Sequence, residues 1–274
     1  MKKNKWYNFF CQNKLCKTHG KKGLGNLISN GHDRNGARKL FCKECEKSFN
    51  ETKGTAFYKK HLSKKEIIKI SKQFVEKSSL RGVARATGHH LDTIRNLAGD
   101  VAEHCFEVTG FLIKDVKLGT HEIDELIAQR TQQPTSKNKI SFCTDANKQN
   151  KNGILKSFHK DSVDYGQVIK DKIMQIVYGV HKRKVIGNMP YQDISIAHVD
   201  GLCKALRERG KCFVREASTY PKKRKMIFII LSIYQAYHNL IDARKGLTPC
   251  MKEGISNHVW TWGKLLNAKV SVEK

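Results

Sequence analysis

The chain has 274 residues and a formal net charge of +27, because 52 lysines and arginines outnumber 25 aspartates and glutamates. A charge this positive favours a polyanionic partner, with nucleic acid ahead of an anionic membrane surface. The most apolar run, Met226–Tyr234, is too short to span a bilayer, and no secretory signal follows Met1. We therefore expect a cytoplasmic protein with no membrane partner. Its nine cysteines would then bind metal or pack as small apolar groups.

Four of the cysteines form two short-spaced pairs. Cys11 and Cys16 make C-x4-C, and Cys42 and Cys45 make C-x2-C, with 25 residues between the pairs. Two such pairs allow four thiolates to surround one Zn²⁺ ion as a tetrahedron. The sequence therefore predicts a zinc ribbon over residues 6–50, in which a structural zinc supplies much of the folding energy.

Short strands are expected beside this metal site. Tyr7–Phe10 and Lys39–Phe41 are apolar segments that lead into the two cysteine pairs, and the glycines between them suit tight turns. His19 or His32 could replace one thiolate as a ligand, although histidines in loops are more often bystanders. The alternative interpretation is four unrelated free cysteines.

The segment Leu80–Leu97, LRGVARATGHHLDTIRNL, is typical of a helix-turn-helix. Gly88 is expected to end the first helix in the left-handed conformation, because glycine adopts it without steric cost. Asp92 or Thr93 is expected to cap the second helix. The residues predicted to face inward are Val83, Ala84 and Thr87 on the first helix and Ile94 and Leu97 on the second.

A supporting helix is predicted in front of this motif, over Ser63–Lys77. Ser63 and Glu66 have the spacing of a capping box, and apolar residues recur behind them at helical spacing. The second helix of the helix-turn-helix is expected to continue through Val108. Together these segments predict a compact helical unit.

The outward surface of the second helix carries polar side chains that suit DNA. Arg95 can pair with guanine and Asn96 with adenine in the major groove, while cations around them contact phosphates. A helical hairpin with an ordinary polar surface is the alternative. The residues predicted to contact DNA are Arg81, Arg85, His90, Thr93, Arg95, Asn96, Arg207 and Arg215.

From Lys117 the pattern changes to interleaved strands and helices. The expected elements are a strand over His121–Ile127, a strand over Ile140–Cys143, a helix around Gly153–His159, a strand at Tyr165–Ile169 or Met174–Tyr178, a β-like stretch at Val177–Gly187, and helices at Ile194–Arg209 and Lys225–Ile241. The last helix is strongly apolar and is expected to form the core of the second unit. Thr248 and Pro249 have the order of an N-cap and a first helical residue.

Three acids fall on these elements or at their ends, namely Asp124, Asp145 and Asp200. Carboxylates that converge can hold Mg²⁺ or Mn²⁺ ions, which activate a water or a 3′-hydroxyl and stabilise the leaving oxygen of a phosphodiester. For any single acid, a solvated surface charge is the simpler explanation. Three acids at neighbouring positions are the stronger signal of a catalytic site.

Together these motifs resemble the transposases of bacterial insertion sequences, which join a zinc ribbon and helix-turn-helix to a DDE nuclease domain of ribonuclease H-like fold. The resemblance covers most of the chain. It is carried by the four cysteines with Phe49 and TKGTAFY (Thr52–Tyr58), by LGTHEIDEL ending at Leu126, and by HVDGLCKALRERGKCFVREASTYPKK and YHNLIDARKGLTPCMKEGISNHVW. It implies that Asp124 and Asp145 are the first two catalytic acids and that Asp200 stands where the family has glutamate. It also implies homo-oligomers that act on double-stranded DNA in the bacterial cytoplasm, associated with the nucleoid.

Two departures from the family pattern concern the nuclease domain. Only 20 residues separate Asp124 from Asp145, where the family normally has several dozen that form strands and a helix of the sheet. Asp200 is one methylene shorter than glutamate. We therefore expect a shortened sheet with an exposed edge, in a copy whose DNA binding survives better than its strand transfer.

The predicted fold class is multidomain α+β. Its parts are a zinc ribbon at residues 1–58, a helix-turn-helix unit at 59–110 and a truncated ribonuclease H-like α/β domain at 111–274. The predicted function is transposition: recognition of element ends, followed by Mg²⁺-dependent cutting and joining of DNA strands. The alternative is a catalytically inactive, transposase-derived DNA-binding regulator. A general RNA- or DNA-coating protein fits the charge but not the helix-turn-helix.

Overall fold

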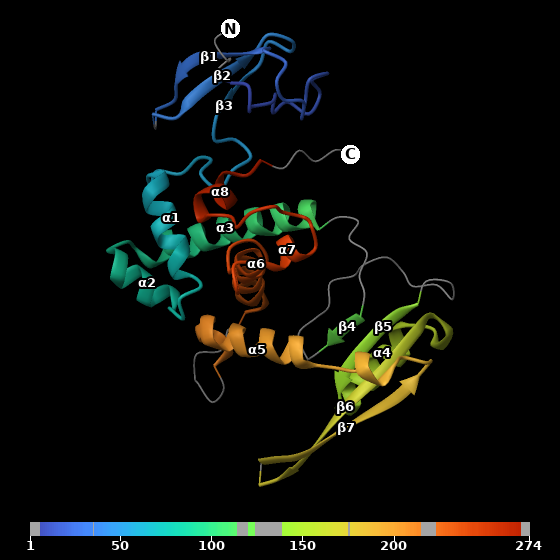
Figure 1. The fold of residues 1–274 in the computed structure, drawn as a ribbon. Coiled ribbons are helices and arrows are strands. Elements are labelled where there is room, and N and C mark those ends of the chain that lie inside the picture. Colours follow the sequence, from blue (N-terminus) through green and yellow to red (C-terminus); the bar gives the residue numbers. More distant parts are fainter. Residues whose placement is uncertain are drawn as a thin grey trace. The chain divides into compact units, whose positions relative to one another are not determined.

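The structure is a computed structural model of the chain (Figure 1). It describes residues 6–34, 36–113, 120–123, 139–174, 176–214 and 223–269. Over these ranges the fold is mixed α+β, with two small sheets and eight α-helices. The chain divides into two compact units: Met1–Lys114 together with Glu208–Lys274, and Asp115–Arg207. None of the helices in the described ranges combines the length and apolar character that a bilayer crossing needs.

The first unit begins with a three-stranded antiparallel sheet in the order β1-β2-β3. Its strands are β1 (Leu27–His32), β2 (Arg38–Cys42) and β3 (Ser48–Asn50). Leu27, Leu40 and Phe49 are buried beside the cysteines and form most of its small core. The predicted strand at Lys39–Phe41 lies within β2 and is confirmed.

The predicted strand at Tyr7–Phe10 is wrong. The N–H of Phe9 donates to the carbonyl oxygen of Trp6 at 3.0 Å, so this segment is a turn. The rings of Trp6 and Phe9 meet edge to face, 5.7 Å apart, and pack against the core. Their apolar character reflects packing, while the ladder partner of β2 comes from β1 inside the segment between the cysteine pairs.

Three helices follow, namely α1 (Lys64–Gln73), α2 (Leu80–Thr87) and α3 (Leu91–Leu112). The Ser63 side chain accepts the N–H of Glu66 at 3.2 Å, which confirms the predicted cap. Helix α1 ends four residues before the predicted Lys77 because the chain turns there. Lys77 has a φ of +52° and its N–H donates to the carbonyl oxygen of Arg209 at 2.7 Å.

The two predicted helices and the turn between them form as predicted, except for one cap. Gly88 ends α2 with a φ of +73°. The cap of α3 is His90, whose side chain accepts the N–H of Asp92 at 3.3 Å, so the prediction of Asp92 or Thr93 is wrong. Because α3 begins at Leu91, Asp92 falls in the first turn, where the helix dipole favours an acid. Of the residues predicted to face inward, Val83, Ala84, Ile94 and Leu97 are buried, whereas Thr87 is half-buried.

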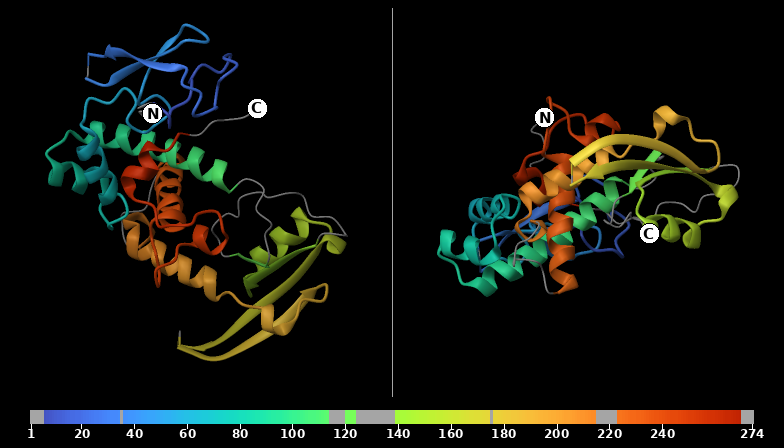
Figure 2. Two further views of the ribbon diagram at one scale, coloured as in Figure 1. Left: turned by 45° about the horizontal axis from the view of Figure 1, so that its top comes forward. Right: turned by 90° about the horizontal axis from the view of Figure 1, so that it is seen from below.

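The C-terminal helices pack on α3 in this same unit. They are α6 (Arg224–Leu240), α7 (Pro249–Lys252) and α8 (Trp262–Asn267). Helix α6 crosses α3, with the rings of Phe106 and Phe228 5.4 Å apart (Figures 1 and 2). The prediction that Lys225–Ile241 forms the core of the second unit is therefore wrong. The long α3 carries a buried row beyond the motif, and α6 covers it.

The second unit is a four-stranded sheet in the order β4-β5-β6-β7. Its strands are β4 (Thr120–Ile123), β5 (Ile140–Asp145), β6 (Val163–Ile173) and β7 (Ile176–Ile186). β4, β5 and β6 are parallel, whereas β7 is antiparallel to β6. Helix α4 (Lys148–Ser157) connects β5 to β6, and α5 (Ala197–Arg209) follows β7.

Several predictions for this region are confirmed with altered bounds. The strand expected at Ile140–Cys143 is β5, and the two alternative strand positions are both real, in β6 and β7. The predicted domain at 111–274 coincides with neither compact unit, since residues 208–274 belong with the N-terminal part. The ribonuclease H-like identity of the sheet stays a prediction.

Candidate metal centre and nucleic-acid interface

The four predicted metal ligands come together in the first unit. The sulfur atoms of Cys11, Cys16, Cys42 and Cys45 all lie within 4.8 Å of one another. The Cys11 and Cys45 sulfurs are 3.6 Å apart, and those of Cys16 and Cys42 are 3.9 Å apart. Tetrahedral zinc with Zn–S bonds of about 2.3 Å needs sulfurs about 3.8 Å apart. The cluster could therefore hold one metal ion of this kind.

Two tight turns place these sulfurs. The N–H of Glu46 donates to the carbonyl oxygen of Cys42 at 2.9 Å, and Glu46 has a φ of +54°. This turn folds Cys45 back beside the end of β2. In the first pair, the N–H of Cys16 donates to the carbonyl oxygen of Asn13 at 2.9 Å. These backbone turns bring the two cysteines of each pair close together.

Polar side chains near the sulfurs suit the thiolate form. Asn26 donates from Nδ2 to the Cys42 sulfur at 3.4 Å and to the Thr18 hydroxyl at 2.8 Å. The Thr18 hydroxyl lies 3.1 Å from the Cys16 sulfur. Such outer hydrogen bonds orient ligands and stabilise their charge. Sequence reasoning missed both residues; Thr18 follows Cys16 closely, but no local signal marks Asn26.

The thiols differ in how readily they lose a proton. Burial raises the pKa of Cys11, whereas a hydrogen bond with the Asn13 side chain lowers the pKa of Cys45 to about 7. Cys45 is also the least buried of the four. A divalent ion would favour the thiolate form of all four, because metal binding releases thiol protons.

Neither candidate histidine belongs to this cluster. The metal-binding group found among the described residues contains cysteines only. His19 Nδ1 lies 2.9 Å from the carbonyl oxygen of Cys11, so this ring braces the first cysteine pair. His32 lies exposed on β1. The interpretation of both as bystanders to the metal fits this geometry.

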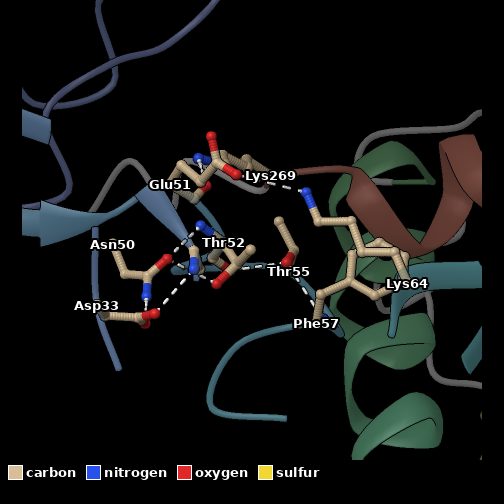
Figure 3. A network of polar contacts seen from close by, with 9 residues as sticks. Asp33, Asn50, Glu51, Thr52, Thr55, Phe57, Lys64 and Lys269 are labelled. Carbon is tan, nitrogen blue, oxygen red and sulfur yellow. Dashed lines mark hydrogen bonds and ion pairs between the residues drawn. The ribbon is translucent and has the colours of Figure 1, made fainter. Parts of the chain in front are cut away.

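The segment between the sheet and the helices forms a polar network (Figure 3). Thr52 donates its N–H to the Asn50 side chain at 3.0 Å, and the Thr55 hydroxyl donates to the carbonyl oxygen of Thr52 at 2.7 Å. The Lys269 ammonium, near the other end of the chain, donates to the carbonyl oxygen of Glu51 at 2.6 Å. This network joins the cysteine-bearing sheet to the helices within one compact unit.

Most of the predicted DNA contacts lie on the helix-turn-helix surface. The residues exposed on α2, the turn and the start of α3 are Arg81, Arg85, His90, Thr93, Arg95 and Asn96. Arg95 forms an ion pair with Asp92 at 2.7 Å, and both side chains are about half exposed. Such a pair has a small net energy, so a DNA base can replace Asp92 at little cost. Arg207 is half buried in α5, and Arg215 lies outside the described residues.

The turn of the motif is braced by a pair that the sequence did not reveal. His89 Nε2 lies 2.8 Å from Oε1 of Glu66, which is in the first turn of α1. The contact ties the three-residue connection between α2 and α3 to the supporting helix. It therefore helps to fix the direction in which α3 leaves the turn.

Two of the three predicted acids lie within the described residues. Asp145 ends β5, and its Oδ1 accepts the N–H of Asn147 and Nδ2 of Asn150, each at 3.0 Å. Asp200, on α5, accepts a hydrogen bond from the Lys170 ammonium at 2.5 Å. Asp124 lies outside the described residues, and β4 is described only to Ile123.

Strand register places Asp145 and Asp200 on one face of the sheet. Asp145 is opposite Val168 on β6, and side chains of paired residues share a face. Lys170, two residues along β6, lies on that face again and binds Asp200. Apart from the cysteine cluster, no group of three metal-ligating side chains is found in the described ranges. The positive charge that Asp200 contacts in the described ranges is therefore the Lys170 ammonium and not a metal site formed with other acids.

A scan against family models, a search of curated proteins and a search of solved structures each found no match.

Proposed function

We propose that this protein is a transposase-type DNA-binding protein that recognises the ends of a mobile DNA element. The observation that carries the proposal is the α2–Gly88–α3 motif with Arg95 and Asn96 exposed on its second helix. The net charge of +27 supports a DNA partner. The polar network around Asn50–Phe57 supports joint presentation of the sheet and the helices to one duplex.

The four cysteines are proposed to bind one structural zinc ion. The small sheet buries few apolar side chains, so metal ligation would supply much of its folding free energy. The zinc has no open coordination position when four thiolates surround it, which suits a structural role and not a catalytic one. Its task is to hold the sheet beside the helix-turn-helix.

Base reading is assigned to the N-terminal part of α3. Arg95 would contact guanine and Asn96 adenine in the major groove, each good contact being worth on the order of 1–3 kcal/mol. Arg81 and Arg85 would contact phosphates and set the register without reading sequence. Ile94 and Leu97 point to the opposite side and keep the helix packed.

Strand cleavage by the acids is the less supported half of the proposal. The shared face of Asp145 and Asp200 favours it, as does the sequence match at Asp124. Two carboxylates, one of them neutralised by Lys170, do not by themselves make a divalent-metal site. The described residues thus fit Mg²⁺ or Mn²⁺ only in part, and we derive no catalytic step through such an ion.

The second candidate function is a catalytically inactive, transposase-derived regulator. The Lys170–Asp200 ion pair is the observation that favours it, together with the short interval between Asp124 and Asp145. Such a protein would bind the same element ends and compete for them. A nicking assay on supercoiled DNA with Mg²⁺ or Mn²⁺ distinguishes the two functions.

The binding proposal is tested by fluorescence anisotropy with a duplex selected for affinity and with a random duplex. Arg95→Ala should lower affinity for the selected duplex far more than for the random one. The control is Arg244→Ala, an exposed arginine in the turn before α7. If Arg95→Ala lowered both affinities equally, α3 would not read bases.

A further inference from the structure

The hairpin formed by β6 and β7 extends beyond the rest of its sheet (Figure 1). β5 pairs with β6 only over Val163–Val168. From Ile169 to Ile173, β6 pairs with β7 and with no other described strand. The outer half of the hairpin is therefore a two-stranded arm, paired with no third strand among the described residues.

The tip of this arm is apolar and exposed. Met174 is 92% exposed, and Ile173 and Ile176 on either side are 63% and 72% exposed. Tyr178 and Val180 continue the apolar surface along β7 at 69% and 57% exposed. Soluble proteins seldom expose apolar side chains in such a contiguous group unless the surface binds a partner.

Met174 is also an unfavourable residue for its position in the turn. Ile173 pairs with Ile176, so two residues connect the strands, and Met174 has a φ of +47°. Such two-residue turns favour asparagine or glycine, because a side chain at positive φ is strained. Residues held in such strained conformations cluster at functional sites, so the methionine suggests a role outside folding.

The stem of the arm is basic. β6 and β7 together carry five lysines and arginines against Asp164 and Asp171. Lys170 and Lys172 lie on the arm itself, and Lys170 also binds Asp200. The other three, Lys182, Arg183 and Lys184, lie at the base of the arm, opposite Gly166–Val168. Asp171 pairs with His181 at 2.6 Å, and Asp164 lies 3.9 Å from Lys139. The arm therefore presents a positive stem behind an apolar tip.

We infer that this arm is a second DNA-binding element, in which Met174 with its isoleucine neighbours inserts between base pairs while the stem cations contact phosphates. The grooves of DNA admit two-stranded β-ribbons, and proteins that bend DNA insert isoleucine or methionine wedges between base steps. The inference rests on the proposed function in that its partner is double-stranded DNA. It adds a sequence-tolerant contact that bends the duplex.

Charge decides between DNA and the other occupants of an apolar tip. A second copy of this chain carries the same charge of +27, so the basic stem would meet a repelling surface. A duplex offers phosphates to the stem and separable base steps to the tip. Flexible pyrimidine–purine steps are the expected sites of insertion, because they unstack most easily.

The test uses the full chain and a random 30-base-pair duplex with a central TA step, carrying donor and acceptor dyes at its ends. Met174→Gly removes the wedge and relieves the positive φ, so the hairpin stays folded. We expect binding to bring the duplex ends together, and Met174→Gly to lose this change and bind about tenfold more weakly. Leu15→Ala, which removes another highly exposed apolar side chain, should behave like the unmodified protein. Lys172→Gln should lower the salt slope of binding by about one.

Unchanged bending and affinity in Met174→Gly would overturn the inference. A lower molecular mass of Met174→Gly than of the unmodified chain in sedimentation equilibrium, with DNA bending retained, would also overturn it. The arm would then be an interface between copies. If Met174→Gly lost binding to phosphatidylserine vesicles but still bent DNA, the arm would be a membrane-binding element and the inference would be overturned. If the unmodified chain bound no duplex, the proposed function would fail as well. If Arg95→Ala kept the sequence preference of the unmodified protein while Met174→Gly lost the bending, the inference about the arm would hold and base reading by α3 would fail.

Discussion

Asn26 Nδ2 donates a hydrogen bond to the sulfur of Cys42 at 3.4 Å, and the same amide group binds the hydroxyl of Thr18. Asn26 is buried and lies just before β1, whereas Cys42 ends β2. The contact therefore links the residue just before β1 to a sulfur of the candidate metal cluster. Loss of this hydrogen bond should lower the affinity for a metal ion more than it lowers the stability of the sheet.

Asn26→Ala should weaken zinc binding about 10- to 100-fold, the range usual for partners of metal ligands. Competition with a coloured chelator at fixed pH measures this. Asn30→Ala is the matched control, since Asn30 is an exposed residue of β1 that bonds Ser48 and not a sulfur. Equal affinities of the two variants would show that the amide does not support the thiolates.

Cys42→Ser should unfold the sheet of residues 6–50 and abolish stoichiometric zinc binding. Four thiolates around one ion supply folding energy that the small core lacks. Elemental analysis should return one zinc per unmodified chain. Cys212→Ser, which changes a cysteine outside the cluster, should leave that value unchanged. A zinc-free protein in which all nine thiols titrate freely would contradict the metal site.

Lys269 makes the joint between sheet and helices sensitive to pH. Burial lowers the pKa of Lys269 from 10.5 to about 8. Between these values the unfolded chain binds more protons, so stability rises with pH. The gain in unfolding free energy is complete above pH 10.5, where Lys269 is neutral in both states. It is lost as the pH falls through about 8, where the buried ammonium forms.

Urea denaturation at pH 7.5 and 9.5 tests this linkage. The unfolding free energy of the unmodified protein should rise relative to that of Lys269→Met, which keeps an unbranched side chain but cannot titrate. Lys245→Met, at an exposed position, should run parallel to the unmodified protein. If the unfolding free energies of Lys269→Met and of the unmodified protein changed equally between the two pH values, Lys269 would not be buried in solution.

The two described acids give a prediction that depends on Lys170. If the sheet cleaves DNA with Mg²⁺ or Mn²⁺, Asp145→Asn should abolish nicking and leave DNA binding intact, since an amide cannot neutralise a divalent ion. Asp200→Glu should preserve or raise activity, because glutamate has the longer reach found in the transposases that the sequence resembles. Lys170→Gln should also raise it by releasing Asp200. Robust nicking by the unmodified chain, unaffected by Asp145→Asn, would exclude this acid from the chemistry.

Local signals in the sequence predicted most of what is local in the structure. The cysteine spacing, the cap at Ser63, the helix stop at Gly88 and the Thr248–Pro249 start of α7 each depend on a few adjacent residues. The cap of α3 was missed because His90, Asp92 and Thr93 all lie within four residues, and a shift of two or three positions changes which one caps.

Contacts between distant segments could not be predicted in the same way. The apolar character of α6 showed that it would be buried, but not that α3 of the first unit would cover it. Asn26 beside Cys42 and His89 beside Glu66 depend on tertiary folding that leaves no periodic trace. The Lys170–Asp200 pair likewise required the register of β6 and the position of α5.

Selection of duplexes from a random pool by the zinc-loaded full chain tests base reading by α3 most directly. The expected result is one enriched motif, with Asn96→Ala relaxing its preference at a single adenine and Arg95→Ala at a single guanine. Enrichment of no motif, or of the same motif by all three proteins, would contradict sequence recognition by the helix-turn-helix.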